Sequence, residues 1–344
     1  MNECPDCSNG VDLQVSRRGF VQSIGTVAAI AAVGPRIGAA AEPAKAPSES
    51  LVKKLYDTLS PAQKEEICFD WDHKDDRGLL RMHVSNNWQI TGEHKIASDF
   101  YTADQKDMIE AIFWGLYSPD WKDRIKKQLQ DDAGGYGKEQ SIAIFGNPDS
   151  GKFEFVMTGR HLTIRCDGHS VEHVAFGGPI FYGHAASGFN EEPNHPGNVF
   201  WYQAQKANSL FQMLDGKQRD LALIAEAPAE RLVHFGGPDG HPQGIVVAEL
   251  SADQKAYAQK VLEALIEPYR TPDQEEVRKC LNAQGGLDKC RLAFYKSGDL
   301  GNDGVWDNWR LEGPSFVWHY RGTPHVHVWA NVADDPSVKI TTKG

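Results

Sequence analysis

Beyond its first 41 residues, this chain of 344 residues has no long apolar run, which argues against a stable membrane anchor in that part. Basic residues are in the minority: 36 Lys and Arg stand against 47 Asp and Glu, for a formal net charge of −11. So acidic a balance argues against nucleic acid as a partner. The chain also lacks a G-x-S-x-G motif, a phosphate-binding loop and a dinucleotide fingerprint in the context that each needs.

Cysteine is scarce, with six in the chain. Cys4 and Cys7 form a single C-x-x-C, which is a weak zinc signal without a second pair. The other four are Cys68, Cys166, Cys280 and Cys290. Cys280 and Cys290 flank a Gly-rich loop, and we predict a disulfide between them in an oxidising compartment. Two separate buried thiols are the alternative.

The start of the chain resembles an export signal. Arg17 and Arg18 precede Phe20 and a moderately apolar segment, which is typical of twin-arginine signals, although two ordinary surface charges are the alternative. Ala39 and Ala41 then give an A-x-A cleavage pattern. We therefore expect recognition by the twin-arginine export machinery, cleavage near Ala41, and a periplasmic or extracellular protein. Because that route carries proteins that are already folded, it suits a chain that loads a cofactor before export.

The predicted organisation has three parts. Residues 1–41 are the signal, residues 42–50 form a disordered tether rich in Pro, Ala, Ser and Glu, and residues 51–344 form a single domain. Helix starts are marked by a recurring capping box, in which a Ser or Thr side chain caps a helix and a Gln three residues later reaches back. Three copies and one looser copy begin at Ser60, Thr102, Ser251 and Asp215. They predict helices from near residues 61, 103, 252 and 216, and a further helix is expected over 198–214.

Strand signals gather in two regions, 141–166 and 306–332, both rich in aromatic and β-branched residues. The segment Gly159-Arg160-His161-Leu162-Thr163-Ile164 aligns with Gly313-Pro314-Ser315-Phe316-Val317-Trp318, and without a gap His173 then aligns with His327. We interpret the two regions as similar hairpins in one antiparallel sheet, with helices packed on one face. The predicted fold class is therefore α+β.

Histidine is abundant, with 13 in the chain, and most lie near the two β-regions. Because residues two apart in a strand face the same side, His325 and His327 can reach one metal ion. The similarity of the hairpins places His161 near them, so we predict a three-histidine site for a transition metal ion. His173, His184 and His195 are reserve ligands. Imidazole suits Zn, Cu, Fe and Ni alike, so the ligand type does not select the metal. Histidines that simply pack in the sheet are the alternative.

Other residues near these strands suggest catalytic and binding roles. Glu312 precedes Gly313 at a strand end and is a candidate ligand or base, with a surface cap as the alternative. Together with His319, it is our candidate for moving protons. Arg165 and Arg321 are candidates for holding an anionic group of a small-molecule substrate or ligand.

Several segments, taken in order, resemble one known family. They are Leu59 to Gln63, Ile144 to Pro148, Gly159 to Ile164, Leu311 to Phe316, and His325 to Trp329. The family is that of the domain of unknown function DUF3500, and the resemblance covers about residues 50–335. Its members are largely secreted, which implies export here, and many carry a second His where this chain has Arg160. The resemblance supports His161, Glu312, His325 and His327 as candidate positions and implies no reaction.

Three functional hypotheses follow. In the first, the protein is an exported metal-dependent enzyme in which a Zn, Cu, Fe or Mn ion activates water or dioxygen. In the second, it is a non-catalytic protein that binds a sugar or another small molecule on a cluster of tryptophans. The cluster consists of Trp306, Trp309, Trp318 and Trp329. In the third, it is a structural or interaction protein of the cell envelope.

Overall fold

The computed structural model describes residues 47–185, 199–230 and 232–338. The predicted signal with Arg17 and Arg18, most of the predicted tether, and His195 lie outside these residues. No helix in the described part of the chain combines the length and the apolar character that a membrane crossing requires.

The described residues form eight α-helices. They are α1 (Ser48–Thr58), α2 (Pro61–Ile67), α3 (Ala103–Gly115), α4 (Lys122–Ala133), α5 (Trp201–Met213), α6 (Gly216–Ala222), α7 (Ala252–Ile266) and α8 (Thr271–Ala283). Helices α2, α3, α6 and α7 begin immediately after the predicted caps, and all four capping boxes are formed. These predicted helix starts are therefore confirmed. They could be predicted because each box satisfies backbone N–H groups at its own helix end, through residues that are close together in the sequence.

The strands of the main sheet are β1 (Cys68–Phe69), β4 (Ser141–Asn147), β5 (Lys152–Gly159), β6 (Leu162–Cys166), β7 (Ile180–His184), β8 (Leu223–Ile224), β9 (Ile245–Val246), β10 (Arg291–Tyr295), β11 (Asn308–Gly313), β12 (Phe316–Arg321) and β13 (Val326–Val332). Strands β2 (Lys74–Asp75) and β3 (Gly78–Leu79) form a separate pair, followed by the short 3-10 helix η1 (Leu80–Met82). The order across the main sheet is β1-β4-β5-β6-β7-β13-β12-β11-β10-β8, and β9 also pairs with β10.

The prediction of a purely antiparallel sheet was wrong in one respect. Strand β1 pairs with β4 and strand β8 pairs with β10 in parallel, whereas the long neighbouring strands pair antiparallel. Both parallel strands are only two residues long and directly follow a helix, so they carry no alternating pattern that a sequence reading could detect. The protein therefore has a mixed α/β architecture with a large, mostly antiparallel sheet.

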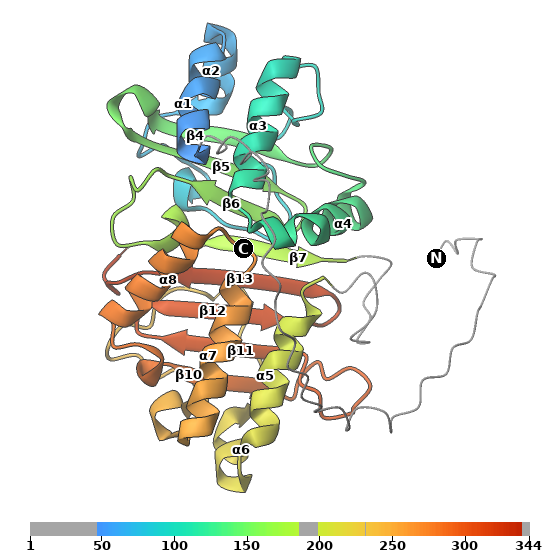
Figure 1. The fold of residues 1–344 in the computed structure, drawn as a ribbon, viewed down its shortest axis with the longest axis vertical. Helices are drawn as coiled ribbons and strands as arrows, with labels where there is room; N and C mark the ends of the chain where they lie inside the picture. Colours follow the sequence, from blue (N-terminus) through green and yellow to red (C-terminus); the bar gives the residue numbers. More distant parts are fainter. Residues whose placement is uncertain (1–46, 186–198, 231, 339–344) are drawn as a thin grey trace, which may run out of the picture. The chain divides into compact units, whose positions relative to one another are not determined.

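The two faces of the sheet have different covers. In β12, Phe316, Trp318 and Tyr320 point into the main core, which also holds residues from α1, α3, α5, α7 and α8. Figure 1 shows these helices lying across one face of the sheet. Val317 points the other way, into a small cluster with Val84 and Val233 from irregular segments. Because side chains alternate along a strand, His319 and Arg321 share this second face with Val317.

The sheet consists of two halves with the same pattern of pairing, which meet at the antiparallel pair β7–β13. Each half is a meander of four strands, β4 to β7 or β10 to β13, with a parallel two-residue strand outside it. The central hairpins close alike, because Gly159 pairs with Leu162 in one half and Gly313 pairs with Phe316 in the other.

The helices before the strands repeat as well. The capping-box glutamines of α2 and α3, Gln63 and Gln105, donate to each other's side-chain oxygens at 2.8 and 3.1 Å. Gln218 and Gln254 of α6 and α7 do the same at 3.0 and 2.8 Å. A shared ancestry of the two β-regions in the sequence itself stays a prediction. His173 does not share the position of His327, because it lies outside the strands and is exposed.

The predicted disulfide is absent from the described residues, where Cys280 and Cys290 are free thiols. Cys280 lies on α8 beside the backbone of Ala175, whereas the sulfur of Cys290 lies close to Gly313 in β11. The two side chains thus pack against different neighbours although only one loop separates them. Burial raises the pKa of both thiols to about 12.

Candidate metal centre

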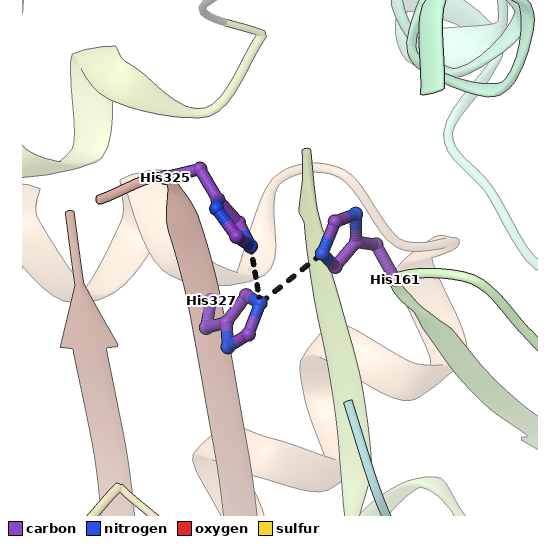
Figure 2. Close-up of side chains that lie close together, drawn as sticks. All are labelled: His161, His325 and His327. Atoms are coloured by element: carbon purple, nitrogen blue, oxygen red, sulfur yellow. Dashed lines mark hydrogen bonds between the residues drawn. The ribbon is translucent and has the colours of Figure 1, made fainter. Parts of the chain in front are cut away.

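Three histidines converge at the boundary between the two halves of the sheet. One ring nitrogen of each of His161, His325 and His327 lies within 4.8 Å of those of the other two. The Nε2 atom of His327 lies 3.1 Å from Nε2 of His161 and 2.8 Å from Nε2 of His325 (Figure 2). The predicted convergence of these residues is therefore confirmed.

Each histidine is held by a different part of the fold. His327 lies on β13, and His325 lies just before that strand, so their side chains point to the same face. His161 occupies the tip of the β5–β6 hairpin with a φ of 52°, in the left-handed region that residues other than glycine rarely adopt. Its N–H donates to the carbonyl of Asn86 at 3.1 Å, which helps to hold this turn. Strained backbone of this kind is frequent at functional sites.

Two carboxylates orient two of the imidazoles. Nδ1 of His161 contacts Asp132, which lies on α4 and also accepts hydrogen bonds from Arg160 and from the N–H of Ala185. Nδ1 of His327 lies 2.8 Å from Oε2 of Glu230. A carboxylate that binds the outer nitrogen of a histidine fixes its tautomer, and this arrangement is usual around metal-binding histidines.

The carboxylate contacts make two ring nitrogens repel each other, namely Nε2 of His161 and Nε2 of His327, which we call the inner nitrogens. When Asp132 and Glu230 accept the Nδ1 protons, Nε2 of both His161 and His327 carries a lone pair instead of a proton. These two lone pairs face each other across 3.1 Å. A cation between them turns this repulsion into attraction.

Two of the three nitrogen separations are close to those around a small metal ion, and the third is within 4.8 Å. Nitrogens about 2.0–2.1 Å from a tetrahedral ion lie about 3.3 Å from one another, which is close to the observed 3.1 and 2.8 Å.

The electrostatic environment favours the neutral form of two of the ligands, His325 and His327. Burial, the nearby His161 and the positive charge of Arg321 lower the pKa of His325 to about 4. Burial also lowers the pKa of His327 to about 4, although its hydrogen bond to Glu230 acts in the opposite direction. Burial alone would raise the pKa of Asp132 and of Glu230, but their histidine and arginine partners lower both. Neutral imidazoles backed by ionised carboxylates are the protonation states that metal binding needs.

The proton-moving candidates do not join this cluster. Glu312 contacts Arg310 at 3.3 Å. It lies four residues along β11 from Asn308, which pairs with Arg321 in the row of His327. At about 3.3 Å per residue, this places Glu312 roughly 13 Å away along the strand direction. His319 is 1% exposed and lines a pocket beside Glu230 and Arg321.

The two candidate arginines differ sharply. Arg165 is fully buried and donates to the carbonyls of Pro179, Arg81 and His83 and to Glu154. Its guanidinium therefore has a structural role and is not accessible to a substrate. Arg321 binds Glu230 at 3.2 Å and the carbonyl of His325 at 3.2 Å, so it positions two members of the site and also reaches the pocket.

Other predicted features are placed outside the site. His173 is exposed and lies 3.0 Å from Asp334, and the ring of His184 stacks on Phe200 on the helix side of the sheet. Trp309, Trp318 and Trp329 are at most 1% exposed, so they form part of the core instead of an open binding platform.

Asp132 and Glu230 are the site residues that sequence reasoning missed. They lie far along the chain from the histidines that they contact, Asp132 on α4 and Glu230 after β8. An acidic residue on a helix that also carries many other charges is not distinguished by type or spacing. Only the fold brings these two carboxylates to the Nδ1 atoms.

Comparison with known proteins gives one match. The model of a family described as "Protein of unknown function (DUF3500)" matches residues 43–334, which is most of the chain. No curated protein matches the chain, and no solved structure does.

Proposed function

This chain belongs to the DUF3500 family, and we propose that it is a metalloprotein whose transition metal ion is held by His161, His325 and His327. The observation that carries the proposal is the pair of carboxylates behind the ligands. Asp132 and Glu230 fix the Nδ1 protons of His161 and His327, so both inner nitrogens offer lone pairs to one point. In a cluster of histidines that merely packs in a sheet, two lone pairs that face each other would only repel.

The ligand set favours a catalytic over a purely structural metal. Three protein ligands leave a fourth position of a tetrahedral ion open, as in catalytic zinc sites, whereas structural sites use four protein ligands. A bound ion of this kind polarises a carbonyl oxygen or makes a bound water acidic. Three imidazoles suit Zn, Cu, Fe or Ni. We therefore favour a metal-dependent enzyme over a ligand-binding protein, because three of the four tryptophans of the predicted platform are buried.

Metal content measured by mass spectrometry tests this proposal. Protein purified without a histidine tag is expected to hold one ion per chain, and a His325→Ala/His327→Ala variant is expected to hold none. The matched control is His173→Ala, which removes an exposed histidine away from the cluster and should leave the ion in place. Thermal unfolding of each variant shows that it is folded. Equal metal in the wild type and the folded double variant would sink the proposal.

We also propose that the protein is exported after folding, on the support of Arg17, Arg18 and the apolar segment that follows them. Conservative replacement of both, Arg17→Lys/Arg18→Lys, keeps the charge and removes the arginine pair. Cell fractionation should then find the uncleaved chain in the cytoplasm, whereas the wild-type chain is cleaved and found outside it. Normal export of the double lysine variant would contradict this part of the proposal.

A further inference from the structure

A pocket of about 320 Å³ lies on the sheet face that carries the histidines. Its lining includes Ala227, Glu230, Ser297, Asn308, His319 and Arg321. Glu230 binds His327 and Arg321 binds the carbonyl of His325, so two lining residues also touch the candidate metal ligands. The volume is at the small end of the range for ligand pockets, which suits a small molecule.

His319 presents an N–H to this pocket. Its ring is 1% exposed, and its Nδ1 accepts a hydrogen bond from Nε of Arg310 at 3.2 Å. An imidazole that accepts at Nδ1 carries its proton at Nε2. No hydrogen bond of Nε2 is found among the described residues, so this N–H is available to a ligand in the pocket.

The other polar groups of the pocket also leave donors unused. Nε of Arg321 is buried and has no hydrogen-bond partner within the described part of the chain. The hydroxyl oxygen of Ser297 accepts from the N–H of Ala227 at 3.0 Å, which leaves its own hydrogen free to donate.

The acceptors are already used. Oε1 of Glu230 binds Arg321 and Oε2 binds His327 and Trp329, while Oδ1 of Asn308 accepts from Gly322. Among the side chains named here, the pocket therefore offers more unused donors than unused acceptors.

At the equivalent position in the other half of the sheet, a longer side chain fills the space. His319 pairs with Arg310 across β11–β12, as Arg165 pairs with Val156 across β5–β6, so Arg165 and His319 occupy equivalent positions. Arg165 fills its position with a guanidinium that is bound to Glu154 and three carbonyls. The shorter imidazole of His319 leaves space and an unused N–H instead.

We propose that this pocket binds the carboxylate group of a small organic acid, held by Arg321, His319 and Ser297 beside the candidate metal centre. A carboxylate brings two oxygens that accept several hydrogen bonds, which matches a pocket lined by donors, and its bonds to a guanidinium are charge-assisted. An amine or ammonium ligand would find few unused acceptors, because those of Glu230 and Asn308 already accept hydrogen bonds. The inference deepens the proposed function, because it places the acid group of the substrate next to the ion.

Calorimetric titration tests the inference, with acetate and propionate as probes and acetamide as the uncharged match of acetate. Each probe is added to the metal-free protein and to the zinc-loaded protein. Acetate should bind both forms, and acetamide should bind much more weakly. His319→Leu should weaken acetate binding roughly tenfold or more, as expected when a hydrogen bond to a charged group is lost. His319→Gln, which restores an N–H donor, should recover part of the affinity.

Two further variants complete the design. Ala227→Leu fills the pocket and should abolish acetate binding, whereas His173→Leu, away from the pocket, should not change it. Metal content is measured on every variant and should stay at the wild-type value.

The possible failures are distinguishable. Equal acetate binding by wild type, His319→Leu and Ala227→Leu would overturn the inference, as would binding that needs zinc and ignores these variants, since acetate would then ligate the ion. Acetate binding that responds to His319 in a protein without any metal site would overturn the proposed function alone.

Discussion

The central hairpins of the two halves of the sheet have the same register but different chemistry on the face away from the helices. In the first half, Glu154 is completely buried between Arg81 and Arg165, at 2.9 and 2.8 Å. In the second half, the equivalent of Arg165 is His319, and a pocket opens beside it. In the first half these charged groups are paired with one another inside the protein, and we call it the closed half. In the second half, which we call the open half, hydrogen-bond donors remain unused beside the pocket.

The hairpin tips differ in the same manner. Ser315, at the position in the β11–β12 hairpin that His161 has in the β5–β6 hairpin, is buried, and its hydroxyl donates to the carbonyl of Ala333 at 2.8 Å. His161 instead points to His325 and His327 and is oriented by Asp132 (Figure 2). One backbone plan therefore carries a structural serine at one tip and a candidate metal ligand at the other. The two hairpins thus differ in a few side chains although their register is the same.

The largest expected effect concerns the closed half. Glu154→Gln removes the charge between Arg81 and Arg165 and leaves two buried guanidinium groups without a counter-ion. We expect the free energy of unfolding to fall by about 3–5 kcal/mol, as is usual when one partner of a buried ion pair is removed. Urea unfolding measures this change.

The open half provides the matched variant for this prediction. His319→Leu lies at the position equivalent to Arg165, and it removes a neutral ring, so the loss should be much smaller. Equal losses for Glu154→Gln and His319→Leu would contradict the contrast between a closed and an open half.

The second prediction concerns the carboxylates at the boundary between the halves. Asp132→Asn and Glu230→Gln keep the size of each side chain but weaken the hold on the Nδ1 protons of His161 and His327. Each should lower the metal affinity by about 10–100-fold, the usual effect of replacing an outer partner of a metal-binding histidine. Competition with a chromophoric chelator measures the affinity. Glu139→Gln, an exposed acid elsewhere in the first half, is the control, and an equal effect there would refute the assigned positioning role.

The third prediction concerns pH. The pKa of both His325 and His327 is lowered from 6.5 to about 4 in the folded protein. Between these two values the unfolded chain binds protons at these residues and the folded metal-free protein does not, so the contribution of these two histidines to the free energy of unfolding should fall as the pH drops. Urea unfolding of metal-free protein from pH 7 to 4 measures the slope. His325→Gln removes one titrating group and should flatten it, and an unchanged slope would contradict the assignment.

The smallest expected effect concerns the contacts between capping-box glutamines, which occur in both halves. Gln105→Ala and Gln254→Ala each remove a capping-box side chain together with its bond to the partner glutamine, Gln63 or Gln218. Because the contacts are equivalent, each variant should lose a similar 1–2 kcal/mol. Thermal or urea unfolding compares the two. A large loss in only one half would show that the repeated contacts do not have equal weight.

The sequence predicted most of what depends on local patterns. The capping boxes located four helix starts because each box acts within a few residues. The His325/His327 pair followed from alternation in a strand, and His161 was placed beside it through the similarity of the hairpins.

What depends on long-range packing could not be predicted. The two-residue parallel strands β1 and β8 have no pattern of their own. Glu312 and His319 are both near the right strands, but only the register shows that one lies far along β11 and the other lines a pocket. Asp132 and Glu230 are brought to the histidines by the path of the chain alone.

The measurement that tests the account most directly is anomalous X-ray diffraction from crystals of the tag-free, metal-loaded protein, recorded on both sides of the absorption edge of the metal. If the three histidines bind the ion, a single anomalous peak is expected about 2.0–2.1 Å from Nε2 of His161, His325 and His327, with Asp132 and Glu230 on the outer nitrogens. A peak bound elsewhere, with the three histidines packed against one another and no ion between them, would contradict it.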